Sequence, residues 1–177
     1  MADSAASLIS SVNYGGGTKS VSFTDIPQTF THLRVVADFM SDPAAGESYG
    51  TQSIYCRANG DTGTNYNYSY CAIGGSFWSS DSNTTYGFIG NIDGDLAAYV
   101  SHNPMVMNIF NYSADEPTTW QGWSGRPSHV GADGQFTFFQ GGVAKASAAW
   151  GITSLEFYAT TVDMATTSRL TLIGMSE

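Results

Sequence analysis

The stretch THLRVVADF, residues 31–39, alternates polar and apolar side chains and indicates the fold class of this chain. Leu33, Val35, Ala37 and Phe39 fall on one face of an extended strand, because successive side chains of a strand point to opposite sides. A half-buried strand has this period of two, whereas an amphipathic helix repeats every 3.6 residues. We therefore predict a β-strand here, with those four side chains turned towards a core.

The same period recurs in short runs that are rich in β-branched and aromatic residues, which favour half-buried strands. The predicted strands are residues 7–12, 19–23, 31–39, 52–57, 66–72, 85–89, 105–112, 135–139, 152–158 and 169–173. Turn-forming Gly, Asn, Asp and Pro separate these runs. The best helical candidates are short, at residues 95–100 and 142–150. Eight to ten strands without alternating helices predict an all-β protein, an antiparallel β-sandwich with jelly-roll-like wiring.

Length and composition bound the class of protein. We predict a single domain over residues 1–177, in which residues 1–17 form either an N-terminal arm for a neighbouring sheet edge or a first strand. Six Lys and Arg against 15 Asp and Glu give a net charge of −9, which argues against nucleic-acid binding. Aromatic residues make up 14% of the chain, enough to bury a core and to exclude disorder. The sequence predicts neither a membrane span nor a signal peptide.

Few residues point to metal or catalytic chemistry. The three histidines, His32, His102 and His129, are far apart in sequence and match no zinc-binding spacing. Asp93 and Asp95 lie in an acidic turn whose register fails the EF-hand pattern, although an irregular loop of this kind can bind calcium. We therefore expect no metal or cofactor, with the acidic turn as the weaker alternative.

An enzyme is not expected either. Serine-nucleophile motifs are absent from the sequence, and glycoside hydrolysis needs a pair of carboxylates that converge. The only carboxylates near predicted strands are Asp38, Glu47, Glu156 and Asp163. The two cysteines, Cys56 and Cys71, are expected to be reduced apolar fillers, with a disulfide between them as the alternative.

Three tryptophans are candidates for contact with a partner or a ligand. Trp120 and Trp123 lie in the segment TTWQGWSG, residues 118–125, and Trp78 lies in a Ser- and Gly-rich stretch predicted as a loop. Exposed aromatic rings among Asn and Gln stack on sugar rings and are also enriched at protein interfaces. Simple packing in the core is the third alternative. The sequence leaves all three open for Trp78, Trp120 and Trp123.

Five blocks of sequence resemble, in order and spacing, a group of tailed-bacteriophage virion proteins. The blocks are FTDIPQTFTHL (23–33), RANGDTGTNY (57–66), IFNY (109–112), WGITSL (150–155) and SRLTLIGM (168–175). Together they span most of the chain from about residue 20 to residue 175. Their Pro, Gly and Asn residues are typical of turns and strand starts, so we expect the blocks to have a structural role and not to form an active site.

The resemblance implies a virion structural protein, most often a capsid decoration (cement) protein. Such a protein is expected to form a homotrimer on the outer surface of the capsid, to bind the major capsid protein and to be made in the host cytoplasm. The alternative that the resemblance leaves open is a tail-fibre or receptor-binding module, which would recognise host-surface glycans through Trp78, Trp120 or Trp123. Neither role involves nucleic acid or a membrane.

Overall fold

A computed structural model describes residues 5–14, 18–40, 51–73, 77–93, 102–113, 117–126, 135–144, 151–159, 164 and 168–176. Within these ranges all regular structure is β-strand. The strands are β1 (Ala6–Asn13), β2 (Ser20–Phe23), β3 (His32–Phe39), β4 (Thr51–Ala58), β5 (Tyr66–Ile73), β6 (Phe77–Thr84), β7 (Gly87–Asp93), β8 (Asn103–Phe110), β9 (Thr118–Arg126), β10 (Gln135–Val143), β11 (Leu155–Ala159) and β12 (Arg169–Met175).

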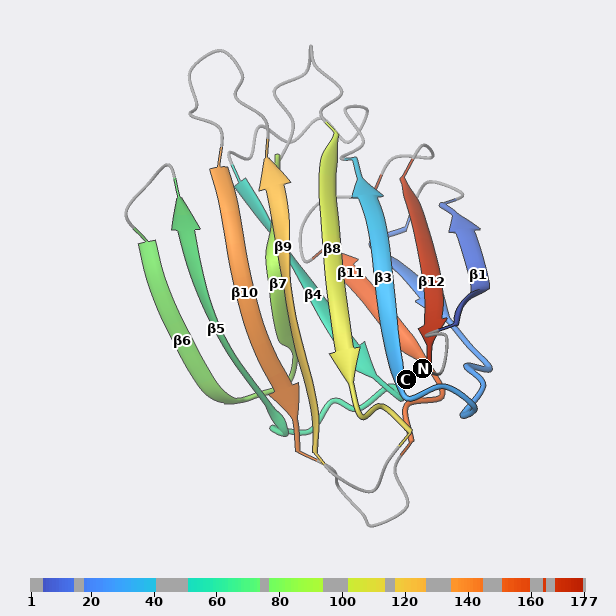
Figure 1. Cartoon of the computed structure of the whole chain (residues 1–177). Coiled ribbons are helices and arrows are strands. Elements are labelled where there is room, and N and C mark those ends of the chain that lie inside the picture. The colour runs from blue at the N-terminus through green and yellow to red at the C-terminus, as the bar shows by residue number, and fades with distance from the viewer. Residues whose placement is uncertain are drawn as a thin grey trace.

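The strands form two antiparallel sheets that pack against each other (Figure 1). The larger sheet has eight strands in the order β1-β12-β3-β8-β9-β10-β5-β6, and the smaller has four in the order β2-β11-β4-β7. The prediction of an all-β antiparallel sandwich is confirmed, and the jelly-roll wiring stays a prediction. Residues 6–13, for which an arm was the alternative, form an edge strand of the larger sheet.

The core lies between the two sheets and follows the alternation read from the sequence. Leu33, Val35, Ala37 and Phe39 of β3 are all buried. They meet side chains from the smaller sheet, and Phe39 lies 6.5 Å from Phe157 of β11 between ring centroids. Because every strand of a sandwich has one face in the core, the side chains of the opposite face point outwards.

Two strands were missed by the sequence-based prediction, and they carry all three candidate tryptophans. Trp78 lies in β6, which was expected to be a loop, and Trp120 and Trp123 lie in β9. Both strands are poor in the regular apolar alternation on which the prediction depended. Of the helical candidates, Gly142 and Val143 belong to β10. The rest of 142–150, apart from Ala144, and all of 95–100 lie outside the described residues.

The larger sheet extends past the smaller one on the side of β5 and β6 (Figure 1). Tyrosines fill the corner that this creates. Tyr70 and Tyr68 of β5 lie 4.3 and 5.7 Å from the ring of Phe88, on the edge strand β7. Tyr86 lies 4.2 Å from Tyr55 and so continues the cluster onto the smaller sheet. These rings cover the edge of the smaller sheet, where β7 would otherwise face solvent.

Candidate functional site

The three tryptophans occupy different environments. Trp78 on β6 is 84% exposed, whereas Trp120 on β9 is 3% exposed and packs against Tyr66 in the core. Trp123 is half-buried and faces the opposite side from Trp120, because three residues along a strand reverse the direction of a side chain. Core packing therefore accounts for Trp120. Trp78 and Trp123 remain available as surface contacts on the outer face of the eight-stranded sheet.

Strand register places an apolar row across this outer face. Val106 of β8 pairs with Trp123 of β9, and Trp123 pairs with Phe138 of β10. Phe138 then pairs with Cys71 of β5, which in turn pairs with Trp78. Paired residues on neighbouring strands point to the same side of a sheet. The register thus joins Trp78 and Trp123, 45 positions apart in sequence, in one row. Its aromatic members, Trp123, Phe138 and Trp78, are called the aromatic row below.

The exposed apolar side chains gather on this same face. Six large apolar side chains are exposed among the described residues, and the register places all of them on the outer face of the eight-stranded sheet: Leu8, Val36, Ile73, Trp78, Phe136 and Phe138. Single exposed apolar residues are ordinary on protein surfaces, but four of these six, Ile73, Phe136, Phe138 and Trp78, lie together on the adjacent strands β10, β5 and β6. Contiguous exposed apolar surface of this kind is typical of interaction sites.

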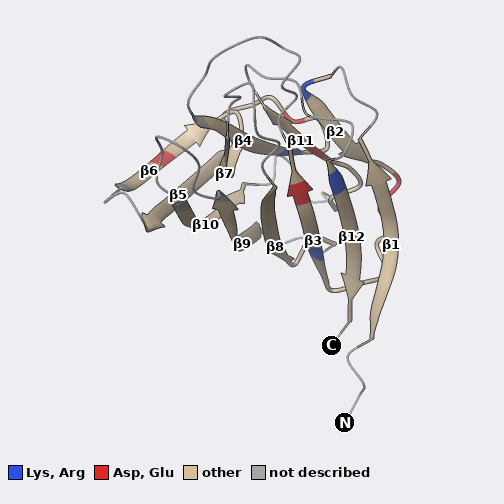
Figure 2. Ribbon diagram, turned by 90° about the horizontal axis from the view of Figure 1, so that it is seen from above, with Lys and Arg blue, Asp and Glu red and all other residues tan. Residues whose placement is uncertain are grey.

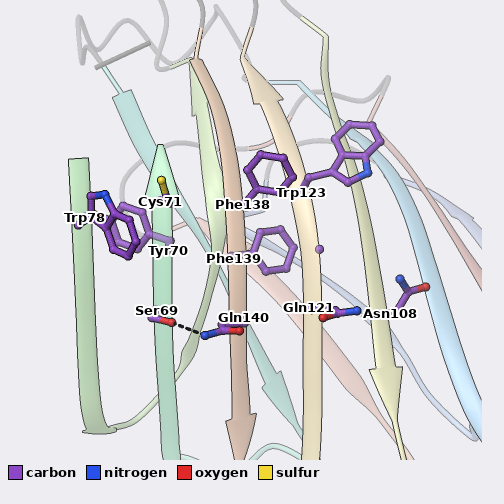
Figure 3. Close-up of a pocket in the computed structure, with 11 residues that line it drawn as sticks. Ser69, Tyr70, Cys71, Trp78, Asn108, Gln121, Trp123, Phe138, Phe139 and Gln140 are labelled. Carbon is purple, nitrogen blue, oxygen red and sulfur yellow. Dashed lines mark hydrogen bonds between the residues drawn. The ribbon is translucent and has the colours of Figure 1, made fainter. Parts of the chain in front are cut away.

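A polar row, called the amide row below, runs beside the apolar row, two residues away along each strand. Its members, taken from β8 to β6, are Asn108, Gln121, Gln140, Ser69 and Ser80, each paired with the next. Gln140 Nε2 donates to Ser69 Oγ at 3.1 Å. The two rows together line a groove of about 410 Å³ with Trp78 on one side and Trp123 on the other, and Phe138 between them (Figure 3).

A second hollow of about 460 Å³ adjoins the first and shares with it Ser69, Gln121 and Gln140. It is also lined by Thr119, Asn67 and Gly141. Gly142 of β10 pairs with Thr119 on one side and with Asn67 on the other. Because glycine has no side chain, the space between Thr119 and Asn67 is left open. The two hollows lie on either side of the amide row and form one elongated depression along β10.

The described lining of the groove is uncharged. Among the residues that the structure describes, no Lys, Arg, Asp or Glu lines either hollow. The strands β5, β8 and β10 contain no charged residue at all, whereas β3 and β12 carry Arg34, Asp38 and Arg169 (Figure 2). Arg34 stands at the end of the amide row, where its Nε donates to Asn108 Oδ1 at 2.8 Å. The outer face thus divides into a charged half and a neutral half.

The residues considered for metal or catalytic chemistry do not converge. Asp38 lies on the eight-stranded sheet, where its Oδ2 is 2.5 Å from Nδ1 of His102, and Glu156 lies on β11 of the other sheet. His32 packs edge-on against Phe110. Glu47, Asp95, His129, Asp163 and the side chain of Asp93 lie outside the described residues. Within the described ranges, no group of three or more His, Cys, Asp or Glu is placed to hold a metal ion.

The two cysteines are both free, so the disulfide alternative is wrong. Cys56 lies on the core face of β4 and is 1% exposed, and burial raises the pKa of its thiol from 9.0 to about 12. Cys71 lies on the outer face of β5 and lines the groove beside Trp78. Because Cys56 points into the core from the four-stranded sheet and Cys71 points outwards from the eight-stranded sheet, they cannot form a disulfide without unfolding of the β-sandwich.

The blocks that resemble virion proteins meet at one end of the sandwich and act as scaffold there. Asn59 Oδ1 accepts hydrogen bonds from the backbone N–H of Thr153 at 2.8 Å and of Ser154 at 3.1 Å. Asn59 Nδ2 donates to the carbonyl of Gly151 at 2.9 Å. Gln28 Nε2 donates to the carbonyl of Ile152 at 2.8 Å. The second and first blocks are thereby tied to the fourth.

Tyr112, from the third block, completes the same junction. Its hydroxyl donates to the carbonyl of Pro27 and accepts from the N–H of Phe30 at 3.3 Å. Its own carbonyl accepts from the N–H of Ile152 at 2.9 Å. The ring of Phe30 in turn lies against Gly174 of the fifth block, where a Cβ would come within 2.3 Å of it. Residues of all five blocks therefore take part in this junction. None of the blocks lines the 410 Å³ groove, and Phe110 of the third block lines the adjoining hollow.

No family model matches the chain, and no curated protein and no solved structure matches it either. Among the residues that the structure describes, no helix is long and apolar enough to cross a membrane.

The sequence-based prediction missed Phe138, Gln121 and Gln140 as members of the candidate site. The alternation of Phe136 and Phe138 in the predicted strand 135–139 was the available signal, but it does not tell which face of the strand is outside.

Proposed function

We propose that this chain is a structural protein of a tailed-bacteriophage virion and that it decorates the outer surface of the capsid as a homotrimer bound to the major capsid protein. The observation that carries the proposal is the pair of exposed apolar side chains on the charged half of the outer face, Leu8 and Val36, which lie near Arg34. Exposed apolar side chains beside arginines are typical of protein interfaces, so this half of the face favours a role in binding. The sequence resemblance supplies the virion context, and the role is non-catalytic.

The charged half of the outer face suits contact with other protein subunits. Leu8 on the edge strand β1 is 68% exposed and Val36 on β3 is 40% exposed. Arg34 lies beside Val36 on β3, and Arg169 lies on the neighbouring strand β12. Arginines next to apolar anchors are frequent at the centre of protein interfaces. A trimer that docks through three copies of this surface gains avidity and resists separation of the capsid subunits.

Localisation on the virion tests this proposal. Cryo-electron microscopy of the virion is expected to show the protein on the outside of the head, and light scattering is expected to give the mass of a trimer. Leu8→Asp should lower occupancy on the capsid at least tenfold, because it places a charge in the contact. Ile73→Asp, at a position of the neutral half that is 58% exposed, is the control. Density confined to the tail, or full capsid occupancy of the Leu8→Asp variant, would contradict the proposal.

A receptor-binding module of the tail is the second candidate function. The observation that favours it is Trp78, which is 84% exposed beside a groove whose described lining residues carry no charge. Aromatic rings beside amides are suited to glycans on a host surface. Tail localisation, together with loss of host adsorption in a Trp78→Ala variant, would select this function over capsid decoration.

A further inference from the structure

We propose that the groove between Trp78 and Trp123 binds an uncharged glycan chain, whose sugar rings lie against the aromatic row and whose hydroxyls bond to the amide row. The inference rests on the second candidate function for its ligand class, but it assigns the ligand and its contacts. The inference also applies to a capsid decoration protein, because the proposed capsid contact lies on the charged half of the outer face.

The aromatic row supplies surfaces for stacking. Trp78 and Trp123 are three strands apart, so their Cα positions are separated by about 14 Å at the usual spacing of about 4.8 Å per strand. The rings of Trp123 and Phe136 stack at 5.3 Å and 20°, which fixes the orientation of Trp123. Phe138, 49% exposed, lies between the two tryptophans. A sugar ring has apolar C–H faces that suit such rings, and the distance admits a chain of rings.

The amide row supplies directed hydrogen bonds. Each Asn or Gln side chain offers both a donor and an acceptor, as does each hydroxyl of a sugar. Gln140 is held by Ser69, and Asn108 is held by Arg34, so both are fixed before a ligand binds. Gln121 is exposed between them and lines both hollows. Because Gln140 and Asn108 are already held, binding a ligand would cost less of their side-chain entropy.

The charge of the groove selects the class of glycan. Its described lining residues carry no charge, and the whole chain has a net charge of −9. An anionic glycan would find no cation inside the groove and would be repelled by the protein as a whole. An uncharged glycan needs no cation in the groove, because its hydroxyls form hydrogen bonds with the amide and serine side chains.

The shape of the groove favours a chain over a single sugar. The two hollows share Ser69, Gln121 and Gln140, so a ligand whose rings lie against the aromatic row in the first hollow can extend over the amide row into the second. The place of the side chain missing at Gly142 opens the second hollow. A protein interface of ordinary size would instead need about 800 Å² of well-packed surface on each partner. Here the apolar row is narrow, and a hydrogen-bonding row runs beside it.

Binding to defined glycans tests the inference. The full chain is applied to an array that carries uncharged oligomers of glucose, galactose, mannose and N-acetylhexosamines beside sialylated and uronic-acid oligomers. We expect binding to at least one uncharged oligomer, whose affinity is then measured by calorimetry. Trp78→Ala and Gln140→Leu should each weaken that affinity at least tenfold, and Leu8→Ala on the other half of the face should leave it unchanged. Trp78 and Gln140 are exposed, so circular dichroism should show the variants folded.

Cys71 allows a second test without a mutation in the rows. Alkylation with N-ethylmaleimide should attach a bulky group beside Trp78 and weaken binding of the same oligomer at least fivefold. The Cys71→Ser variant should bind the oligomer and be insensitive to the reagent. Unchanged affinity after complete alkylation, verified by mass spectrometry, would overturn the placement of the ligand.

Three other results would overturn the inference. One is the absence of any bound uncharged oligomer at millimolar concentration, and another is preference for the anionic oligomers. The third is a Trp78→Ala variant whose glycan affinity is unchanged but whose assembly has a different mass in light scattering. That result would assign the neutral half to contact with a second copy of the chain. Failure of capsid localisation alone leaves all these binding measurements valid, so the two proposals fail separately.

Discussion

At the scale of single residues, Asn59 has two structural roles. Its backbone adopts a positive φ of 54°, which lets the chain turn after β4, and Asn tolerates this conformation better than most residues. Its side chain then joins the turn to residues 151–154, and the partner Gly151 is 92 positions away in sequence. A local turn residue thereby fixes a long-range contact between two segments.

Replacing Asn59 by alanine should lower the free energy of unfolding by about 2–3 kcal/mol, because backbone groups of residues 151–154 lose their partners. Urea unfolding followed by tryptophan fluorescence measures this change. Asn83→Ala is the matched control, since Asn83 also has a positive φ, 58°, but is exposed. Asn83→Ala should lower the free energy of unfolding by only about 1 kcal/mol, because alanine is strained at a positive φ. Equal losses in the two variants would show that the side chain of Asn59 contributes little.

The two cysteines give a second prediction at this scale. In the folded protein one thiol, that of Cys71, should react with a disulfide reagent such as Ellman's reagent, because Cys56 is buried and its pKa is raised to about 12. The second equivalent should appear only after unfolding in urea. Counting the released thiolate by absorbance checks the prediction, with Cys71→Ser as the control that should release none before unfolding. Two fast equivalents under native conditions would contradict the burial of Cys56.

At the scale of elements, β9 owes its place to glycines as much as to its tryptophans. A Cβ at Gly122 would lie 2.1 Å from the carbonyl oxygen of Val106 and 2.6 Å from the ring of Phe139. The strand therefore passes close to β8 and to a core ring of β10 at this point. Gly125 of the same strand faces outwards, and a Cβ there would lie 3.5 Å from Pro104, an ordinary contact.

Gly122→Ala should therefore lower the free energy of unfolding by about 1–3 kcal/mol, the usual cost of overpacking. Gly125→Ala should change it by less than about 0.5 kcal/mol, or raise it slightly, because the strand conformation is easier for alanine. Thermal unfolding of the two variants side by side measures the difference. If both variants are as stable as the parent, the close approach at Gly122 is not part of the folded structure.

At the scale of the whole molecule, buried tyrosines link stability to pH. Burial raises the pKa values of Tyr68 and Tyr158 from 10.0 to about 12 and also raises that of Tyr66. Arg57, whose Cζ lies 4.5 Å from the centre of the Tyr158 ring, lowers the pKa of that group but does not offset its burial. These phenols stay protonated in the folded protein at a pH where they ionise in the unfolded chain.

Stability should consequently fall at high pH. Between pH 10 and 12 the unfolded chain has lost protons from these tyrosines and the folded protein has not, so the unfolded state is favoured as pH rises. The buried thiol of Cys56 acts in the same direction from about pH 9, near its ordinary pKa of 9.0. Urea midpoints should be nearly constant from pH 7 to 9 and decline beyond. The decline should be shallower in Tyr158→Phe, and a midpoint that rises above pH 10 would contradict the burial of these groups.

The sequence by itself determined the all-β antiparallel class, the core face of β3 and the structural nature of the five blocks. These follow from local rules, since a period of two places side chains on alternate faces and Pro, Gly and Asn direct turns. It did not determine β6 and β9, because their Ser, Asn and Gly residues have little apolar alternation and their conformation depends on pairing with neighbouring strands.

Only the tertiary structure decided which face of each strand is covered. The sequence could not separate Trp120 from Trp123, and it could not bring Trp78 into one row with Phe138 and Trp123. Such a row requires the register of four strands, and strand pairing over long sequence distances is set by the packing of the two sheets. The groove exists because an eight-stranded sheet has an outer face that the four-stranded sheet does not cover.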